Sequence, residues 1–188
     1  RYPRAGAPNA DVRLGVVAAS GGDTRWMRLG DTRDFLLARV AWLPGGKAVA
    51  AVRMNRVQNR LDLLAADAAT GATRLLLQET DRCWVNIHDH LRFLPRSNRF
   101  LWSSERDGFR HFYFYSNTGM LLNQITQGDW EDGDVAGVDE TAGRVYFTSH
   151  EDTPLEDHLY MVNFDGSGRR RLSSPGSTHS ISMGPDCG

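Results

Sequence analysis

One pattern recurs along this chain: an apolar run, a tight turn and a second apolar run. Full copies lie at residues 38–52, 91–104 and 135–149, and a cut-off copy begins at His179. Each full copy continues into a second hairpin, with turn residues at Thr70-Gly71, Asn117–Gly119 and Asp165-Gly166. The spacing of roughly 45–50 residues, with four strands per copy, is in the range of propeller blades. We therefore predict an all-β chain that forms a partial β-propeller of four-stranded antiparallel blades.

The segment from Phe100 to Tyr115 shows how these strands are covered. Two aromatic-rich runs flank Asp107-Gly108, which favours a tight reversal, so we predict a β-hairpin. Alternate residues of a strand point to opposite faces. In the second run one face carries Phe109, His111, Tyr113 and Tyr115, and the other carries Arg110, Phe112 and Phe114. Aromatic residues on both faces indicate that both faces are covered, as in a stack of small sheets.

The repeat divides the 188 residues into about three whole blades. The predicted parts are a half blade at 1–37, blades at 38–82, 83–128 and 129–174, and the first strand of another blade at 175–188. The half blade holds predicted strands at Val12–Ala18 and Thr24–Leu29, and the last part holds one near Ile181. Such a piece cannot close a ring by itself, because each blade buries its faces on its neighbours. Since open strand edges pair with other chains, we expect self-association, most simply as a homodimer.

One segment disagrees locally with the repeat. Leu61–Thr70 is rich in leucine and alanine, which are strong helix formers. Its place in the repeat nevertheless matches Phe109–Tyr115 and His158–Phe164. We predict a strand here, because burial between blades can override a local propensity.

Composition excludes several classes of partner. The formal net charge is −1, so the chain lacks the basic excess that would indicate binding to nucleic acid. No apolar run approaches the length of a membrane span. The cysteines Cys83 and Cys187 lie far apart without CxxC spacing and are either bridged or free, which leaves the redox compartment open. The sequence begins at Arg1 without a methionine, so we expect it to be processed or excised.

Motifs for catalysis or cofactor binding are not found in the sequence. It contains no GxSxG, no Walker-type loop and no dinucleotide fingerprint. Ser103, Ser104 and Ser149 are interpreted as ordinary strand and turn residues, because nothing in the sequence pairs them with a histidine. We therefore predict no catalytic residue and no cofactor in this chain.

The most chemically suggestive cluster is Asn86-Ile-His88-Asp89-His90. His88 and His90 would share a strand face and could bind a metal together, but no third ligand is identifiable, so no metal site is predicted. This copy of the repeat is longer here than the others, and extra residues in loops of a rigid scaffold often serve binding. The alternative is a loop that only satisfies backbone groups. We select Asn86, His88 and Asp89 as candidate substrate-binding residues.

Four stretches carry a family resemblance. Tyr2-Pro3-Arg4-Ala5-Gly6, followed by Asn9 and Val12, resembles the YPKAG…N..V signature of dipeptidyl peptidase IV proteins. The stretches at 84–89, 103–111 and 126–131 are similar, in order and spacing, to bacterial members of that family in the prolyl oligopeptidase clan. Single motifs of this length are weak, but four in order are specific, and they span essentially the whole chain.

The resemblance implies an eight-bladed propeller that caps an α/β-hydrolase domain of the same chain with a Ser-Asp-His triad. Such an enzyme removes dipeptides from peptides with a free N-terminus and prefers Pro or Ala as the second residue. In the family, two glutamates upstream of the opening motif hold the substrate ammonium group and the triad lies downstream, so neither can be assigned to a residue here. The loop at 84–89 corresponds to a region near the substrate pocket.

Location and competing functions follow from the same resemblance. Bacterial relatives are often exported, so a periplasmic or secreted protein is expected, and a cytoplasmic one stays possible. A propeller that binds a peptide or protein without an attached hydrolase is the alternative function. Another branch of the prolyl oligopeptidase clan is a third alternative, against which the opening motif and the 84–89 stretch count.

Overall fold

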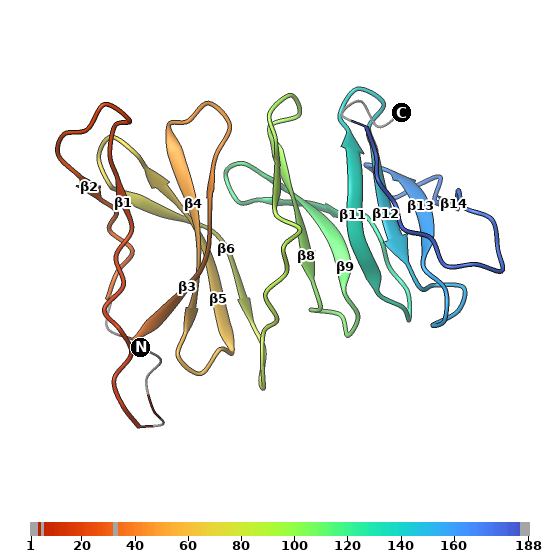
Figure 1. Cartoon of the computed structure of the whole chain (residues 1–188), viewed down its shortest axis with the longest axis horizontal. Coiled ribbons are helices and arrows are strands. Elements are labelled where there is room, and N and C mark those ends of the chain that lie inside the picture. The colour runs from red at the N-terminus through yellow and green to blue at the C-terminus, as the bar shows by residue number, and fades with distance from the viewer. Residues whose placement is uncertain (1–3, 5, 32–33, 185–188) are drawn as a thin grey trace. The chain divides into compact units, whose positions relative to one another are not determined.

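The computed structural model describes residues 4, 6–31 and 34–184, and these form strands and loops without a helix. Within the described residues, therefore, no helix is long and apolar enough to cross a membrane. The chain divides into two compact units, residues 1–87 and residues 88–188. Figure 1 shows both units and labels most of their strands.

The first unit contains a two-stranded and a four-stranded antiparallel sheet. The small sheet pairs β1 (Gly15–Val16) with β2 (Arg25–Trp26). The larger sheet has the order β3 (Phe35–Trp42), β4 (Ala48–Asn55), β5 (Arg60–Asp67) and β6 (Thr73–Thr80). Both are meanders, in which each strand pairs with the next along the chain.

The second unit contains two further four-stranded meanders. One is β7 (Arg92–Leu94), β8 (Arg99–Ser104), β9 (His111–Ser116) and β10 (Leu121–Gln124). The other is β11 (Asp132–Asp139), β12 (Arg144–Ser149), β13 (His158–Asn163) and β14 (Arg170–Arg171). Three four-stranded antiparallel sheets in sequence order confirm the predicted fold class, a partial β-propeller.

The segment with helical composition is a strand. Residues 60–67 form β5, which pairs along one edge with β4 and along the other with β6. Leu61 and Leu63 are at most 1% exposed, and Ala66 is fully buried. Burial on both faces outweighs the helical preference of leucine and alanine, so the prediction from the repeat is confirmed.

The predicted hairpin at 100–115 is also confirmed. β8 and β9 pair from Arg99–Ser116 to Ser104–His111, and Gly108 in the turn has a φ of +106°. On β9, Phe112 and Phe114 are fully buried in the core of the second unit. Tyr113 on the opposite face is only 3% exposed. Both faces of this strand are therefore covered.

Two predicted strands are shorter than expected and one is wrong. Only Gly15–Val16 of the predicted strand at 12–18, and Arg25–Trp26 of that at 24–29, pair as strands. Each has a single partner, so the ladder has no third strand to extend it. The described residues from Leu172 to Gly184 contain no strand, so the one predicted near Ile181 is wrong. Tyr2, Pro3, Ala5 and Cys187 lie outside the described residues, and the blade boundaries stay predictions.

A buried polar network joins the two sheets of the second unit. Asp132 begins β11 and is fully buried, and its Oδ2 accepts a hydrogen bond from the Thr126 hydroxyl. The same oxygen lies 3.6 Å from Nδ1 of His111 on β9. Nε2 of His111 contacts the Gly128 carbonyl at 2.9 Å, and its ring packs edge-on against Trp130. The 126–131 motif thus forms the connection between the sheets and closes over His111.

The network controls the protonation of His111. Burial by itself lowers the pKa of the imidazole, but the Asp132 carboxylate and the Gly128 carbonyl outweigh it and raise the pKa above its ordinary value. Burial likewise raises the pKa of Asp132, against the opposing effects of His111 and Thr126. Both shifts mean that the folded pair holds a proton more tightly than the same two groups do in the unfolded chain.

This arrangement predicts a pH dependence of stability. Because the folded pKa of His111 is raised, its stabilising contribution is complete below the unfolded value of 6.5 and is lost as pH rises through the folded pKa. Asp132→Asn should lower the free energy of unfolding by about 1.5–3 kcal/mol near pH 6, the range for hydrogen bonds to charged groups. The difference in free energy of unfolding between wild type and Asp132→Asn should become smaller at higher pH.

Urea unfolding of the chain between pH 6 and 9 measures this dependence. The matched control is His150→Asn, because His150 also faces an aspartate, Asp157, at 3.2 Å, but is about half exposed. Parallel pH profiles for wild type and Asp132→Asn would show that the buried pair does not bind the proton as described.

Candidate functional site

The loop with the predicted substrate-binding residues connects β6 to β7 and is longer than the connection from β10 to β11. Asn86 belongs to the first unit and is exposed. His88 and Asp89 belong to the second unit, where His88 is half-buried and Asp89 is exposed.

In the first unit the loop is held by its backbone. Oδ1 of Asp81 accepts hydrogen bonds from the amides of Cys83 at 2.6 Å and Trp84 at 3.0 Å, which hold the pKa of this carboxyl below its ordinary value. The Val85 amide donates to the Gln58 carbonyl at 2.9 Å, and the Val85 side chain is buried. These contacts leave the side chains of Trp84 and Asn86 exposed.

In the second unit the loop is held by His90, which is 8% exposed. Nδ1 of its ring lies 3.0 Å from the Ser103 hydroxyl on β8. Nε2 lies 3.4 Å from Oδ1 of Asp134 on β11. The ring also packs edge-on against Phe112, with centroids 5.5 Å apart. His90 therefore connects the loop to one strand in each sheet of this unit.

The contacts define the tautomer of His90. Burial lowers the pKa of the ring, and Arg110 and Arg92 lower it further, against the opposing effect of Asp134. The ring is therefore neutral near pH 7, with one N–H. Because an ionised carboxylate only accepts, Nε2–H donates to Asp134, and Nδ1 accepts from the Ser103 hydroxyl.

His88 is held by two neighbours. Its ring stacks on that of His90, with centroids 6.1 Å apart and an interplanar angle of 6°. Its Nε2 lies 3.3 Å from Oε1 of Glu105, which follows β8. The two rings thus lie side by side as predicted, but residues 88–90 are in a loop and not in the predicted strand, and the exposed Asp89 lies between the histidines in sequence. Among the described residues, no group of three or more His, Cys, Asp or Glu side chains is placed to hold a metal ion.

Ser103, His90 and Asp134 have the composition of a catalytic triad, but their setting does not suit a nucleophile. Ser103 is 2% exposed and lies in β8, which is paired on both edges with β7 and β9. A substrate carbonyl cannot approach a hydroxyl buried in the interior of a sheet, so the trio is a structural brace. This brace is not apparent in the sequence, because Ser103 and Asp134 are 13 and 44 positions from His90 and no short motif connects them.

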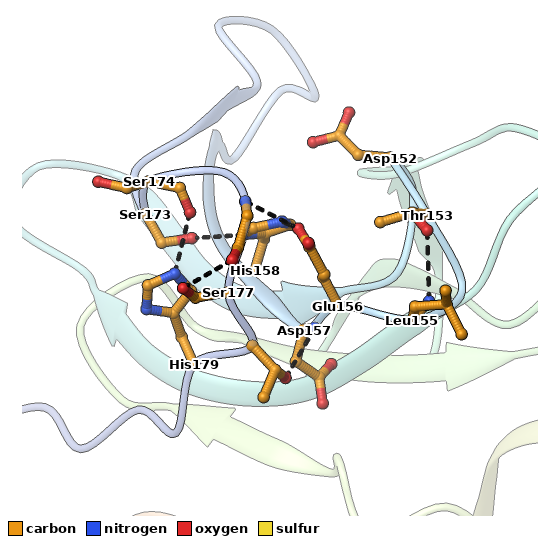
Figure 2. A network of polar contacts seen from close by, with 12 residues as sticks. Asp152, Thr153, Leu155, Glu156, Asp157, His158, Ser173, Ser174, Ser177 and His179 are labelled. Atoms are coloured by element: carbon orange, nitrogen blue, oxygen red, sulfur yellow. Dashed lines mark hydrogen bonds and ion pairs between the residues drawn. The ribbon is translucent and has the colours of Figure 1, made fainter.

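A second brace, of serine, histidine and glutamate, lies further along the second unit (Figure 2). His158 at the start of β13 is fully buried, with Nδ1 3.0 Å from the Ser173 hydroxyl and Nε2 2.8 Å from Oε2 of Glu156. The Ser173 hydroxyl also accepts from the Leu159 amide. This brace holds the segment after β14 against the start of β13.

Comparison with known proteins identifies the family. Residues 1–188 match the model for the dipeptidyl peptidase IV (DPP IV) N-terminal region. The chain belongs to this family. The motifs that carried the resemblance in the sequence therefore indicated the right relatives.

Individual relatives agree with this assignment. The chain is 28% identical to mouse dipeptidyl peptidase 8, with all of the chain and 28% of the relative covered. It is 29% identical to probable dipeptidyl-aminopeptidase B of Emericella nidulans, with all of the chain and 23% of the relative covered. The crystal structure of Porphyromonas gingivalis dipeptidyl peptidase 4 superposes with a TM-score of 0.83 at 28% identity, covering 92% of this chain and 24% of that one.

The DPP IV N-terminal region described here thus spans about a quarter of the length of the relatives it matches. A putative dipeptidyl aminopeptidase IV from Bacteroides ovatus shows the same relation, with a TM-score of 0.79 at 25% identity over 90% of this chain and 27% of that one. The fold and family of this chain are shown by these matches. Because they cover only about a quarter of each relative, these matches do not by themselves show the activity of a whole protein that contains this region.

Proposed function

We propose that this chain is a propeller section of a serine exopeptidase that releases N-terminal dipeptides and prefers Pro or Ala at the second position. The observation that carries the proposal is the family match over all 188 residues, together with relatives named as dipeptidyl peptidases. The peptide substrate has a free N-terminus, and a hydrolase domain of the same chain supplies the nucleophile.

The propeller contributes access control in this proposal. Blades with buried faces form a rigid wall, which admits slim, unfolded peptides to an enclosed reaction site and excludes folded proteins. Holding the peptide end in a fixed position supplies part of the catalytic effect, because it removes translational and rotational freedom before reaction. The rigid part of the wall in the second unit is its aromatic core, and the loop carries exposed polar groups.

The loop faces the substrate in the proposed enzyme, with Asn86, His88 and Asp89 as its binding residues. Asp89 is exposed between two anchored histidines, so its carboxylate can meet a ligand without moving the loop. Glu105, whose Oε1 lies 3.3 Å from Nε2 of His88, is a second carboxylate next to this part of the loop. Carboxylates accept hydrogen bonds from the N–H groups of a bound peptide.

The chain by itself should have no peptidase activity. Ser103 of the Ser–His–Asp grouping near the loop is buried in a sheet, and the sequence carries no nucleophile motif. Purified 188-residue chain should leave Gly-Pro-p-nitroanilide intact, whereas the full-length protein should cleave it and spare the N-acetylated substrate. Turnover by the chain that a serine-directed inhibitor abolishes would contradict this expectation. Absence of turnover by the full-length protein would favour the alternative, a binding propeller without an enzyme.

Substitution of the loop tests its role in the full-length protein. His88→Ala/Asp89→Ala should raise KM for dipeptide substrates roughly 5- to 30-fold, the factor that 1–2 kcal/mol represents, with kcat little changed. The matched control is His150→Ala/Asp157→Ala, which removes another partly exposed His–Asp pair of the second unit. Equal KM values for wild type and the loop variant would show that the loop does not meet the substrate.

We also propose that the isolated chain self-associates. In the first unit, the side chains of Val17, Trp26, Val40 and Trp42 are each about half exposed, and large exposed apolar patches mark interaction surfaces. A twofold dimer covers such surfaces on both copies at once. Sedimentation equilibrium should show a dimer mass that dissociates on dilution, and Trp26→Lys/Trp42→Lys should weaken it. A monomer mass at the highest concentration would contradict this proposal.

A further inference from the structure

We propose that His90 is a positioning residue, which fixes the conformation in which the loop presents Asp89 and His88 to a peptide. This inference rests on the proposed function, because it assigns a role within the same site. His90 does not meet the peptide: it is 8% exposed, and both ring nitrogens are engaged by side chains of the chain itself. Its effect on binding therefore acts through its neighbours.

The first step of the argument is the placement of the two ring contacts. Ser103 is in β8 and Asp134 is in β11, so one ring connects the loop to both sheets of the second unit. The backbone ladder of this sheet begins only at Arg92, two residues after His90. Between Asp89 and Arg92 the side chain of His90 thus holds the backbone in place, as strand pairing does from Arg92 onward.

The two contacts differ in strength. Ser103 is 2% exposed, so loss of its partner would leave a buried hydroxyl without its acceptor. The Asp134 side chain is 96% exposed and lies 3.4 Å from Nε2, and exposed contacts of this kind contribute little. The Ser103 contact should therefore carry most of the positioning.

The second step connects His90 to the exposed side chains. The His88 ring lies parallel to the His90 ring, which together with Glu105 defines its orientation. Asp89 lies between these two anchored residues, so its backbone is fixed on both sides. A shift of the His90 ring would move the stacked His88 ring, and the backbone of Asp89 would then no longer be fixed on either side.

Four single variants of the full-length protein separate positioning from general stability. His90→Phe keeps the ring packing and removes both polar contacts. His90→Asn places an amide near the Nδ1 position and keeps an acceptor for Ser103, whereas His90→Gln extends an amide toward Asp134. The control is His158→Phe, which removes a similar histidine brace, with a serine and a glutamate, outside the loop.

The measurements are KM and kcat for Gly-Pro-p-nitroanilide, the melting temperature, and amide hydrogen exchange of residues 84–92. His90→Phe should raise KM roughly 2- to 10-fold, the size of one hydrogen bond's net contribution, with kcat little changed and loop exchange faster. His90→Asn should restore most of the wild-type KM and exchange, and His90→Gln should restore little. His158→Phe should lower the melting temperature and leave KM and loop exchange as in wild type.

Other outcomes overturn specific statements. Unchanged loop exchange in His90→Phe, or an equal rise of KM in His158→Phe, would show that His90 only stabilises the fold. If His90→Gln rather than His90→Asn restored the wild-type KM and loop exchange, the contact with Asp134 and not that with Ser103 would carry the positioning. Faster loop exchange in His90→Phe with unchanged KM, both there and in His88→Ala/Asp89→Ala, would support the brace and reject the substrate role of the loop.

Discussion

Burial of the middle strands on both faces is the constraint on which the rest of this structure depends. In β9, Phe112 and Phe114 fill the core on one face while His111 and Tyr113 are covered on the other. A strand in this position has no side that faces water, so each polar side chain on it needs a partner within the protein. His111 obtains such partners from Asp132 and Gly128, which follow β10. The polar network between the sheets is thus a consequence of two-sided burial.

The same constraint produces the other braces of the second unit. Ser103 is buried in β8 and pairs with His90, and His158 is buried at the start of β13 and pairs with Ser173. In each case one partner belongs to a covered strand and the other to a segment outside regular strand pairing. The buried polar group gains a hydrogen bond and the segment gains a fixed attachment. Loop position and strand burial are therefore coupled.

The sequence predicts those features that depend on local pattern and repetition. The strand–turn–strand copies indicate the sheets, and the alternating aromatics of 109–115 indicate two covered faces. The repeat also identifies β5 as a strand, although Leu61–Thr70 considered alone is helical in composition. Strand extent at 12–18 and near Ile181 is predicted wrongly, because ladder length depends on partner strands and not on the apolar run itself. The pairing of His90 with Asp134 could not be predicted, because only the fold brings these positions together.

The loop at 84–90 divides anchoring and exposure between different residues in each unit. In the first unit Val85 is buried and Trp84 and Asn86 are exposed, and in the second unit His90 is buried and Asp89 is exposed. A loop fixed in this way loses little conformational entropy when a ligand binds, because the ordering has occurred on folding. An exposed group on a mobile loop would bear that cost at each binding event. The buried histidine, which touches no ligand, is therefore the residue on which a fixed display of Asp89 depends.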